Sequence, residues 1–107
     1  MKVLGYCRIS TIKQSNGTSL EYQSKKIKDF CQFKGLELTE IFEEIDSGGN
    51  DERVVLNRIR QMIESNEVSV LLIAKIDRLG RTMLSSLQFI EDCKKHKVRV
   101  ISIDDNI

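Results

Sequence analysis

The fold is indicated most clearly by one nearly unbroken apolar run, Val68-Ser69-Val70-Leu71-Leu72-Ile73-Ala74. A short run without alternating polar side chains is typical of a strand that is buried on both faces of a sheet. Similar runs cover residues 2–9 and 98–103, and a weaker one lies within residues 36–45, around 38–42. We therefore expect four strands, with the strand at 68–74 in the centre.

Three segments whose apolar residues recur at helical spacing separate these strands. The first opens at Thr18-Ser19-Leu20-Glu21, a T-x-x-E pattern that predicts a capping box, and it ends at Lys34-Gly35. The second covers residues 52–64 and the third covers residues 82–96. The apolar face of the third helix is expected at Leu84, Leu87, Ile90 and Cys93.

Strands that alternate with helices in this way are joined by crossover connections. The sequence therefore predicts the α/β class, with a mainly parallel sheet of four or slightly more strands and helices on both faces. A length of 107 residues suits one domain with one core, and we expect residues 1–107 to form it.

The composition excludes several classes of protein. With 40% hydrophobic and 31% charged residues, the chain is expected to be globular, not disordered. No apolar run approaches the ~20 residues that cross a bilayer, and the first residues become polar too soon for a secretory signal. The three cysteines, Cys7, Cys31 and Cys93, have no close pairing, which predicts reduced and mostly buried thiols. We expect a cytoplasmic protein with no membrane partner.

The charge balance of the chain is not typical of a free-standing DNA-binding domain. Seventeen Lys and Arg residues against sixteen Asp and Glu residues give a net charge of +1 at pH 7. A free-standing DNA-binding domain is usually more basic, because neutralising phosphates supplies much of the affinity. If the protein acts on DNA, its main DNA-binding surface is expected in another segment.

The first strand leads into a group of residues suited to phosphate chemistry. Ligands of open parallel sheets bind outside the carboxyl ends of the strands. Tyr6, Arg8 and Ser10 share parity there, so their side chains project to the same side while the chain stays extended. Ser10 could attack a phosphodiester while Arg8 holds its oxygens. Strand position alone also leaves open that Ser10 merely starts a turn and that Arg8 is a solvated charge.

The central strand leads into a second charged group, Lys75-Ile76-Asp77-Arg78-Leu79-Gly80-Arg81. Arg78 and Arg81 are three residues apart and share a face if the backbone has begun a helical turn. Two guanidinium groups suit an anion site, in which Asp77 orients one of them or handles a proton. The alternative is a surface ion-pair cluster at the start of the next helix.

Weaker candidates lie in the loops. Arg53 follows a glycine-rich stretch and could reach a phosphate, or could simply begin a helix. Lys13 and Gln14 could touch a DNA backbone or be ordinary polar loop residues. His96 is the single histidine and no C-x-x-C or H-x-x-x-H spacing occurs, so we expect no metal site. No glycine-rich nucleotide-binding pattern occurs, so we expect no cofactor.

Three motifs in order resemble those of the serine site-specific recombinases, which include resolvases, invertases and large serine integrases. The first is Gly5-Tyr6-Cys7-Arg8-Ile9-Ser10-Thr11 followed by Gln14, and the second is Asp46-Ser47-Gly48 followed by Arg53. The third is the segment at residues 75–81, which departs least from the family pattern. Cys7 stands where small residues are common in the family. The resemblance covers nearly all of the chain and implies a resolvase-like catalytic domain.

The resemblance implies a reaction without ATP or metal. Ser10 would attack a phosphate of double-stranded DNA, forming a 5′-phosphoserine link and releasing a 3′-hydroxyl. The matched residues around the scissile phosphate would be Arg8, Arg53, Asp77, Arg78 and Arg81. We expect DNA contacts from Tyr6, Lys13 and Gln14. Strand exchange in this family takes place in a homotetramer built from two DNA-bound homodimers.

The subclass and the boundaries follow from the same resemblance. Residues 17–23 look more like large serine integrases and transposon recombinases than small resolvases. The family's dimerisation helix and DNA-binding domain would lie after Ile107. We therefore expect a truncated catalytic domain that is inactive by itself.

Two other functions compete with this one. The first is a phosphate-ligand-binding or regulatory α/β module without catalysis, but a phosphoacceptor would need clustered carboxylates where Arg8 and Ser10 stand. The second is another phosphoryl-transfer enzyme, such as a serine phosphatase or a metal-dependent nuclease. A nuclease needs paired acids for its metal, and only Asp77 is suitably placed.

Overall fold

Four strands pair in parallel to form one sheet in the computed structural model, which describes residues 1–9, 19–45, 53–80 and 82–107. The strands are β1 (Lys2–Ile9), β2 (Glu40–Ile45), β3 (Val68–Ile73) and β4 (Arg99–Ser102), in the order β2-β1-β3-β4. The helices are α1 (Leu20–Lys34), α2 (Val54–Glu64) and α3 (Met83–Lys95), and a 3-10 turn, η1 (Ile76–Arg78), follows β3. The predicted α/β class and parallel sheet are confirmed.

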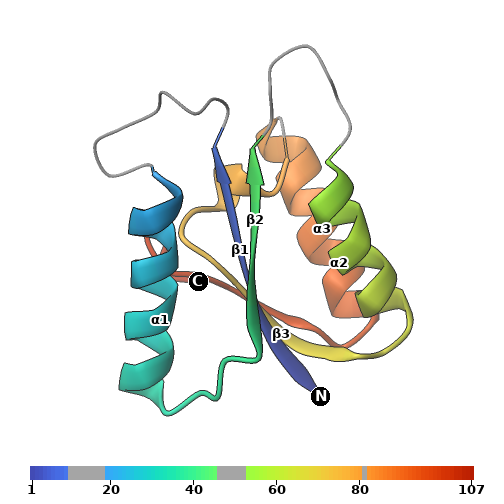
Figure 1. The fold of residues 1–107 in the computed structure, drawn as a ribbon. Coiled ribbons are helices and arrows are strands. Elements are labelled where there is room, and N and C mark those ends of the chain that lie inside the picture. The colour runs from blue at the N-terminus through green and yellow to red at the C-terminus, as the bar shows by residue number, and fades with distance from the viewer. Residues whose placement is uncertain (10–18, 46–52, 81) are drawn as a thin grey trace.

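The helices cover both faces of the sheet, with α1 on one face and α2 and α3 on the other (Figure 1). Because β1 and β3 lie in the centre, alternate side chains of each strand enter two separate apolar layers. The layer under α1 contains Cys7, Ile27, Cys31, Leu72 and Ile101. The layer under α2 and α3 contains Leu4, Tyr6, Leu56, Ile59, Ile63, Val68, Leu71, Ile73, Leu79, Phe89, Cys93 and Val98. This arrangement confirms that the apolar runs of β1 and β3 are buried on both faces.

The ends of α1 agree with the sequence at one terminus and differ at the other. The residue that caps the start is Ser19, not Thr18, because the Ser19 hydroxyl accepts from the Tyr22 amide at 3.1 Å. Thr18 lies outside the described residues. The helix ends as predicted, with Gly35 in the left-handed region at φ 72°.

The strand expected within residues 36–45 begins only at Glu40. The chain between α1 and β2 is used first to close the helix. The Leu36 amide donates to the Cys31 carbonyl at 2.8 Å, which is the six-residue bond of a Schellman cap. Pairing with β1 starts after this cap, where Leu4 lies opposite Glu40.

The predicted apolar face of α3 is wrong for its first two members. Leu84 and Leu87 are 65% and 46% exposed, whereas Ser86, Phe89 and Cys93 are buried. Residues spaced by three fall short of a full helical turn by about 60° at each step. A stripe that runs from Leu84 in steps of three therefore reaches the opposite side of the helix at Cys93.

The three cysteines are free and buried, as expected. Burial is the largest cause of their raised pKa values, which reach about 12 for Cys7 and Cys93. The pKa of Cys31 is also raised by burial. Thiols in this state are poor nucleophiles at neutral pH, because the thiolate is the reactive form.

No helix within the described ranges is long and apolar enough to span a bilayer.

Candidate functional site

One edge of the sheet gathers the ends of the strands and the starts of the helices. β1 and β2 end there, η1 follows β3 there, and α2 and α3 begin there (Figure 1). This is the edge at which parallel sheets bind ligands. Both segments that the sequence singled out, the end of β1 and the residues after β3, lie at it.

Arg8 joins these two segments directly. Its Nε donates to the Arg78 carbonyl oxygen at 3.1 Å, and its Nη2 donates to the Asp77 carbonyl oxygen at 3.0 Å. Arg8 is only 7% exposed and has the same parity along β1 as Tyr6. The guanidinium group is therefore anchored to the backbone of η1, and it ties the end of β1 to the turn after β3.

Asp77 and Arg78 occupy this turn with unequal exposure. The Asp77 side chain is 62% exposed and the Arg78 side chain 12%, and Asp77 Oδ1 lies 3.6 Å from Arg78 Nε. The carboxylate can thus orient the neighbouring guanidinium group, which is one of the two roles expected for it.

Gln23 is a site residue that the sequence analysis missed. It is 1% exposed on α1, its Oε1 accepts from the Arg8 amide at 3.0 Å and its Nε2 donates to the Arg8 carbonyl at 2.9 Å. β3 stops at Ile73, opposite Tyr6, and the Gln23 amide satisfies both backbone groups of Arg8 as a neighbouring strand would. The signal for it was a glutamine four residues before Ile27, on the buried face of a helix.

Tyr6 lies inside the domain, which contradicts the expected direct contact with DNA. The side chain is 0% exposed and its hydroxyl donates to Glu44 Oε1 at 2.5 Å. The pKa of Tyr6 is raised far above its usual range. Burial is the largest cause and the hydrogen bond to Glu44 is the second, while the nearby charges of Arg8 and Arg53 oppose the rise. Tyr6 therefore stays protonated and supports the site from beneath.

Glu44 is the second residue that the sequence analysis missed. Its carboxylate accepts from the Tyr6 hydroxyl, from the Val55 amide at 2.8 Å and from the Leu56 amide at 3.3 Å. The residue at the N-cap of α2, Arg53, makes no side-chain cap bond of its own. Glu44 is 7% exposed at the end of β2 and therefore caps α2 from a neighbouring strand. This cap fixes the start of the helix from which the Arg53 side chain projects.

Replacing Glu44 with glutamine is expected to destabilise the domain by about 1–3 kcal/mol, because one amide group cannot accept at both carboxylate oxygens. Urea denaturation of the 107-residue chain measures this loss. The matched control is Glu43→Gln, an exposed neighbour on the same strand, with an expected change within about 0.5 kcal/mol. Equal stability of the two variants would show that Glu44 does not hold α2.

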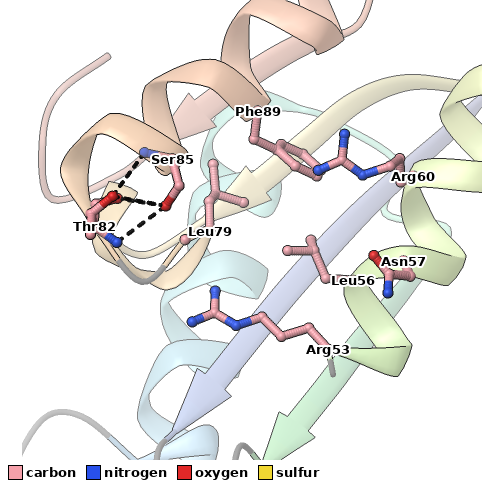
Figure 2. Close-up of a pocket in the computed structure, with 9 residues that line it drawn as sticks. Arg53, Leu56, Asn57, Arg60, Leu79, Thr82, Ser85 and Phe89 are labelled. Atoms are coloured by element: carbon pink, nitrogen blue, oxygen red, sulfur yellow. Dashed lines mark hydrogen bonds between the residues drawn. The ribbon is translucent and has the colours of Figure 1, made fainter. Parts of the chain in front are cut away.

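Arg53 extends from the start of α2 toward the turn that carries Leu79 (Figure 2). It is 8% exposed and lines a pocket of about 360 Å³ between α2 and the start of α3. Of the described candidate residues, Arg53 alone lines this pocket. Arg8 and Arg53 both lie close enough to Tyr6 to affect its pKa by charge.

The other walls of this pocket hold α2 and α3 together. The Arg60 guanidinium stacks 4.7 Å from the centre of the Phe89 ring and lies 3.2 Å from Asp92. Thr82 and Ser85 form a reciprocal capping box at the start of α3, with both amide bonds at 3.1 Å (Figure 2). These contacts fix the helix that carries Arg53 relative to the turn after η1.

The described part of the site thus combines three guanidinium groups, those of Arg8, Arg53 and Arg78, with the carboxylate of Asp77. Guanidinium groups bind phosphate oxygens through paired hydrogen bonds, so this edge suits a phosphate ester. Within the described ranges, no group of three or more histidine, cysteine, aspartate and glutamate side chains could hold a metal ion. His96 lies at the C-cap of α3, with Nδ1 3.0 Å from the Asp92 carbonyl oxygen.

The remaining candidates lie outside the described residues. These are the expected nucleophile, two expected DNA contacts and one arginine of the third motif, namely Ser10, Lys13, Gln14 and Arg81. The Asp46-Ser47-Gly48 motif also lies outside.

Comparison with known proteins gives a consistent family. Residues 3–107 match the family described as "Resolvase, N terminal domain". The chain is 35% identical over 107 residues to the transposon Tn3 resolvase of Escherichia coli, covering 100% of this chain and 52% of that protein. It therefore spans about half the length of such relatives.

Solved structures share the fold. The N-terminal catalytic domain of TP901-1 integrase superposes with a TM-score of 0.87 at 28% identity, covering 100% of this chain and 81% of that one. A resolvase family site-specific recombinase from Streptococcus pneumoniae superposes with a TM-score of 0.84 at 30% identity, covering 100% and 74%.

Proposed function

The chain belongs to the resolvase family, and on that premise we propose that it is the catalytic domain of a site-specific recombinase that acts on double-stranded DNA. The observation that carries the proposal is the pair of hydrogen bonds from Arg8 to the carbonyls of Asp77 and Arg78. These bonds bring the strand that leads into Ser10 against the turn that supplies a second guanidinium group. A nucleophile at the end of β1 would meet its phosphate between these segments.

In the proposed reaction, the Ser10 hydroxyl oxygen attacks a DNA phosphorus. A bond forms between Ser10 Oγ and the phosphorus of the 5′-phosphate, and the bond from phosphorus to the 3′-oxygen breaks. The serine loses one proton, and the leaving 3′-oxygen takes up one proton to become a hydroxyl. After strand exchange, a 3′-hydroxyl of the partner DNA attacks the phosphoserine and the serine regains a proton. One ester replaces another at each step, so no ATP is consumed.

The arginines are proposed to act on the charge that develops at phosphorus. Arg78 and Arg53 would contact the non-bridging oxygens, together with Arg81, because guanidinium groups stabilise the added negative charge of the transition state. Arg8 would serve both the phosphate and the backbone of η1, to which it already donates two hydrogen bonds. Asp77 would orient Arg78.

The proposed partners follow from the family. The DNA would be double-stranded, with Lys13 and Gln14 near its backbone, and the active assembly would be a homotetramer made from two homodimers. A cytoplasmic location suits the three buried, free thiols, which persist in a reducing compartment.

The proposal predicts a covalent protein–DNA adduct at Ser10. The recognition site is first selected from a random duplex library by binding to the full-length recombinase that contains this domain. A nicked substrate with that site, which loses a short fragment after cleavage and cannot religate, then traps the intermediate. Peptide mapping by mass spectrometry should find the 5′-nucleotide on the peptide that contains Ser10. Site binding without any adduct would instead favour a phosphate-binding module without catalysis.

A further inference from the structure

Asp105 lies after the last strand and contacts the turn that carries the site. Its Oδ2 accepts from the Ile76 amide at 2.7 Å and from the Ser102 hydroxyl at 2.6 Å. Ile76 is the first residue of η1, and the preceding residue, Lys75, makes no side-chain cap bond. Asp105 therefore caps η1 from a position 29 residues further along the chain.

The segment that carries Asp105 is itself held by separate bonds. The Ile103 amide donates to the Ile73 carbonyl at 3.0 Å, and the Asp104 amide donates to the Ala74 carbonyl at 2.8 Å. The Asp104 carboxylate forms an ion pair with Lys26 on α1. The two backbone bonds continue the pairing of β3 with β4 past its last strand residue, so the acceptor for Ile76 is in place without the help of η1.

η1 then passes this anchoring to the residues of the site. Ile76 is buried at 6% exposure, and the next two residues, Asp77 and Arg78, offer the carbonyl oxygens that hold Arg8. A turn of three residues has little freedom between its first amide and those carbonyls. Releasing Ile76 would therefore move both acceptors of Arg8 and the Arg78 side chain together.

We propose that Asp105 is a positioning residue. Its carboxylate oxygen fixes the position of η1, which places Arg78 and Arg8 in the arrangement needed for phosphoryl transfer. The proposal rests on the recombinase function proposed above. The hydrogen bond from Ser102, then that from the Ile76 amide, lowers the pKa of Asp105, with a smaller contribution from the charge of Lys75. The carboxylate is thus ionised at neutral pH and is a strong acceptor.

The test compares three variants of Asp105 and its neighbour in the full recombinase. Asp105→Ala is expected to slow DNA cleavage by up to about 100-fold with site binding unchanged, because small displacements of positioned groups have effects of this size. Asp105→Asn keeps one oxygen where both bonds are accepted and should restore most of the rate. Asp104→Ala, the matched control, loses the ion pair to α1 but keeps the backbone bonds from the Ile103 and Asp104 positions, which hold the segment, and should cleave at close to the unaltered rate.

A second measurement separates positioning from general stability. In nuclear magnetic resonance spectra of the isotope-labelled 107-residue chain, the Ile76 amide and the Arg8 Nε–H signals should both shift in Asp105→Ala, with the amides of β1 and β3 unmoved. Unaltered cleavage by Asp105→Ala, or an unmoved Arg8 signal, would overturn the positioning role. If the unaltered recombinase does not cleave DNA, the recombinase proposal fails, and the Arg8 signal still decides whether Asp105 sets η1.

Discussion

Replacing Ser10 with alanine is expected to abolish the covalent protein–DNA product, with a loss of cleavage rate of more than about a thousandfold. The reason is chemical: alanine has no oxygen with which to form the phosphoserine link, and the arginines of the site cannot replace a nucleophile. Binding to the recognition site should stay near its original strength, because that affinity is expected mainly from the DNA-binding region. Adduct formation on the nicked substrate and a gel-shift titration measure the two quantities.

The matched control for this substitution is Ser15→Ala, which removes a hydroxyl five residues further along the same segment. It should retain both cleavage and binding. Adduct formation by Ser10→Ala at a rate similar to that of Ser15→Ala would exclude Ser10 as the nucleophile. Loss of site binding by Ser10→Ala in a folded protein would indicate a recognition role instead.

Replacing Gly80 with alanine is expected to cost about 1–3 kcal/mol of stability, the range observed for overpacked sites. A Cβ atom at this position would lie 2.7 Å from the Ser86 amide nitrogen and 3.0 Å from the Ser85 carbonyl carbon, and it would also collide with the Ser85 hydroxyl. Two of these atoms belong to the backbone of the first turn of α3, which cannot rotate away. The segment that follows η1 must therefore move from α3, and cleavage should fall by up to about 100-fold.

Gly5→Ala provides the comparison for Gly80→Ala. A Cβ atom at Gly5 would lie 3.1 Å from Ile27 Cγ2 and 3.1 Å from Ile41 Cγ1, which are side-chain atoms that can shift by tenths of an ångström. We expect a smaller loss of stability in urea denaturation. A Gly80→Ala variant as stable and as active as Gly5→Ala would refute the close packing on α3 of the segment that follows η1.

The sheet-edge rule identified the two segments of the site because it requires only that the strands run parallel. The apolar runs of β1 and β3 defined both strands, and parallel strands must bring their carboxyl ends to one edge. The sequence therefore predicted that Arg8 and the segment containing Asp77 and Arg78 lie at the same edge, but not that the backbone carbonyls of these two residues accept hydrogen bonds from Arg8.

Predictions that depended on the rotation or environment of one residue were less successful. The N-cap of α1 falls on Ser19, one residue later than the T-x-x-E pattern indicated. Leu84 and Leu87 face outward because a stripe with steps of three drifts around the helix. Tyr6 shares the parity of Arg8, as predicted. However, α2 and α3 cover β1 at that point, so the Tyr6 hydroxyl contacts Glu44 instead of solvent.

By itself, the sequence determined the elements, the parallel direction of the strands, the burial of the central strands and the residue types at the edge of the sheet. Periodicity, helix ends and the alternation of strands with helices along the chain are local properties, because neighbouring residues determine them. The tertiary structure alone decided the partners: Glu44 for the Val55 amide, Gln23 for Arg8 and Asp105 for the Ile76 amide, which lie 11, 15 and 29 residues apart. These bonds form because backbone groups left unpaired at strand and helix ends must be satisfied in the folded domain, and only the packing determines which side chain is within reach.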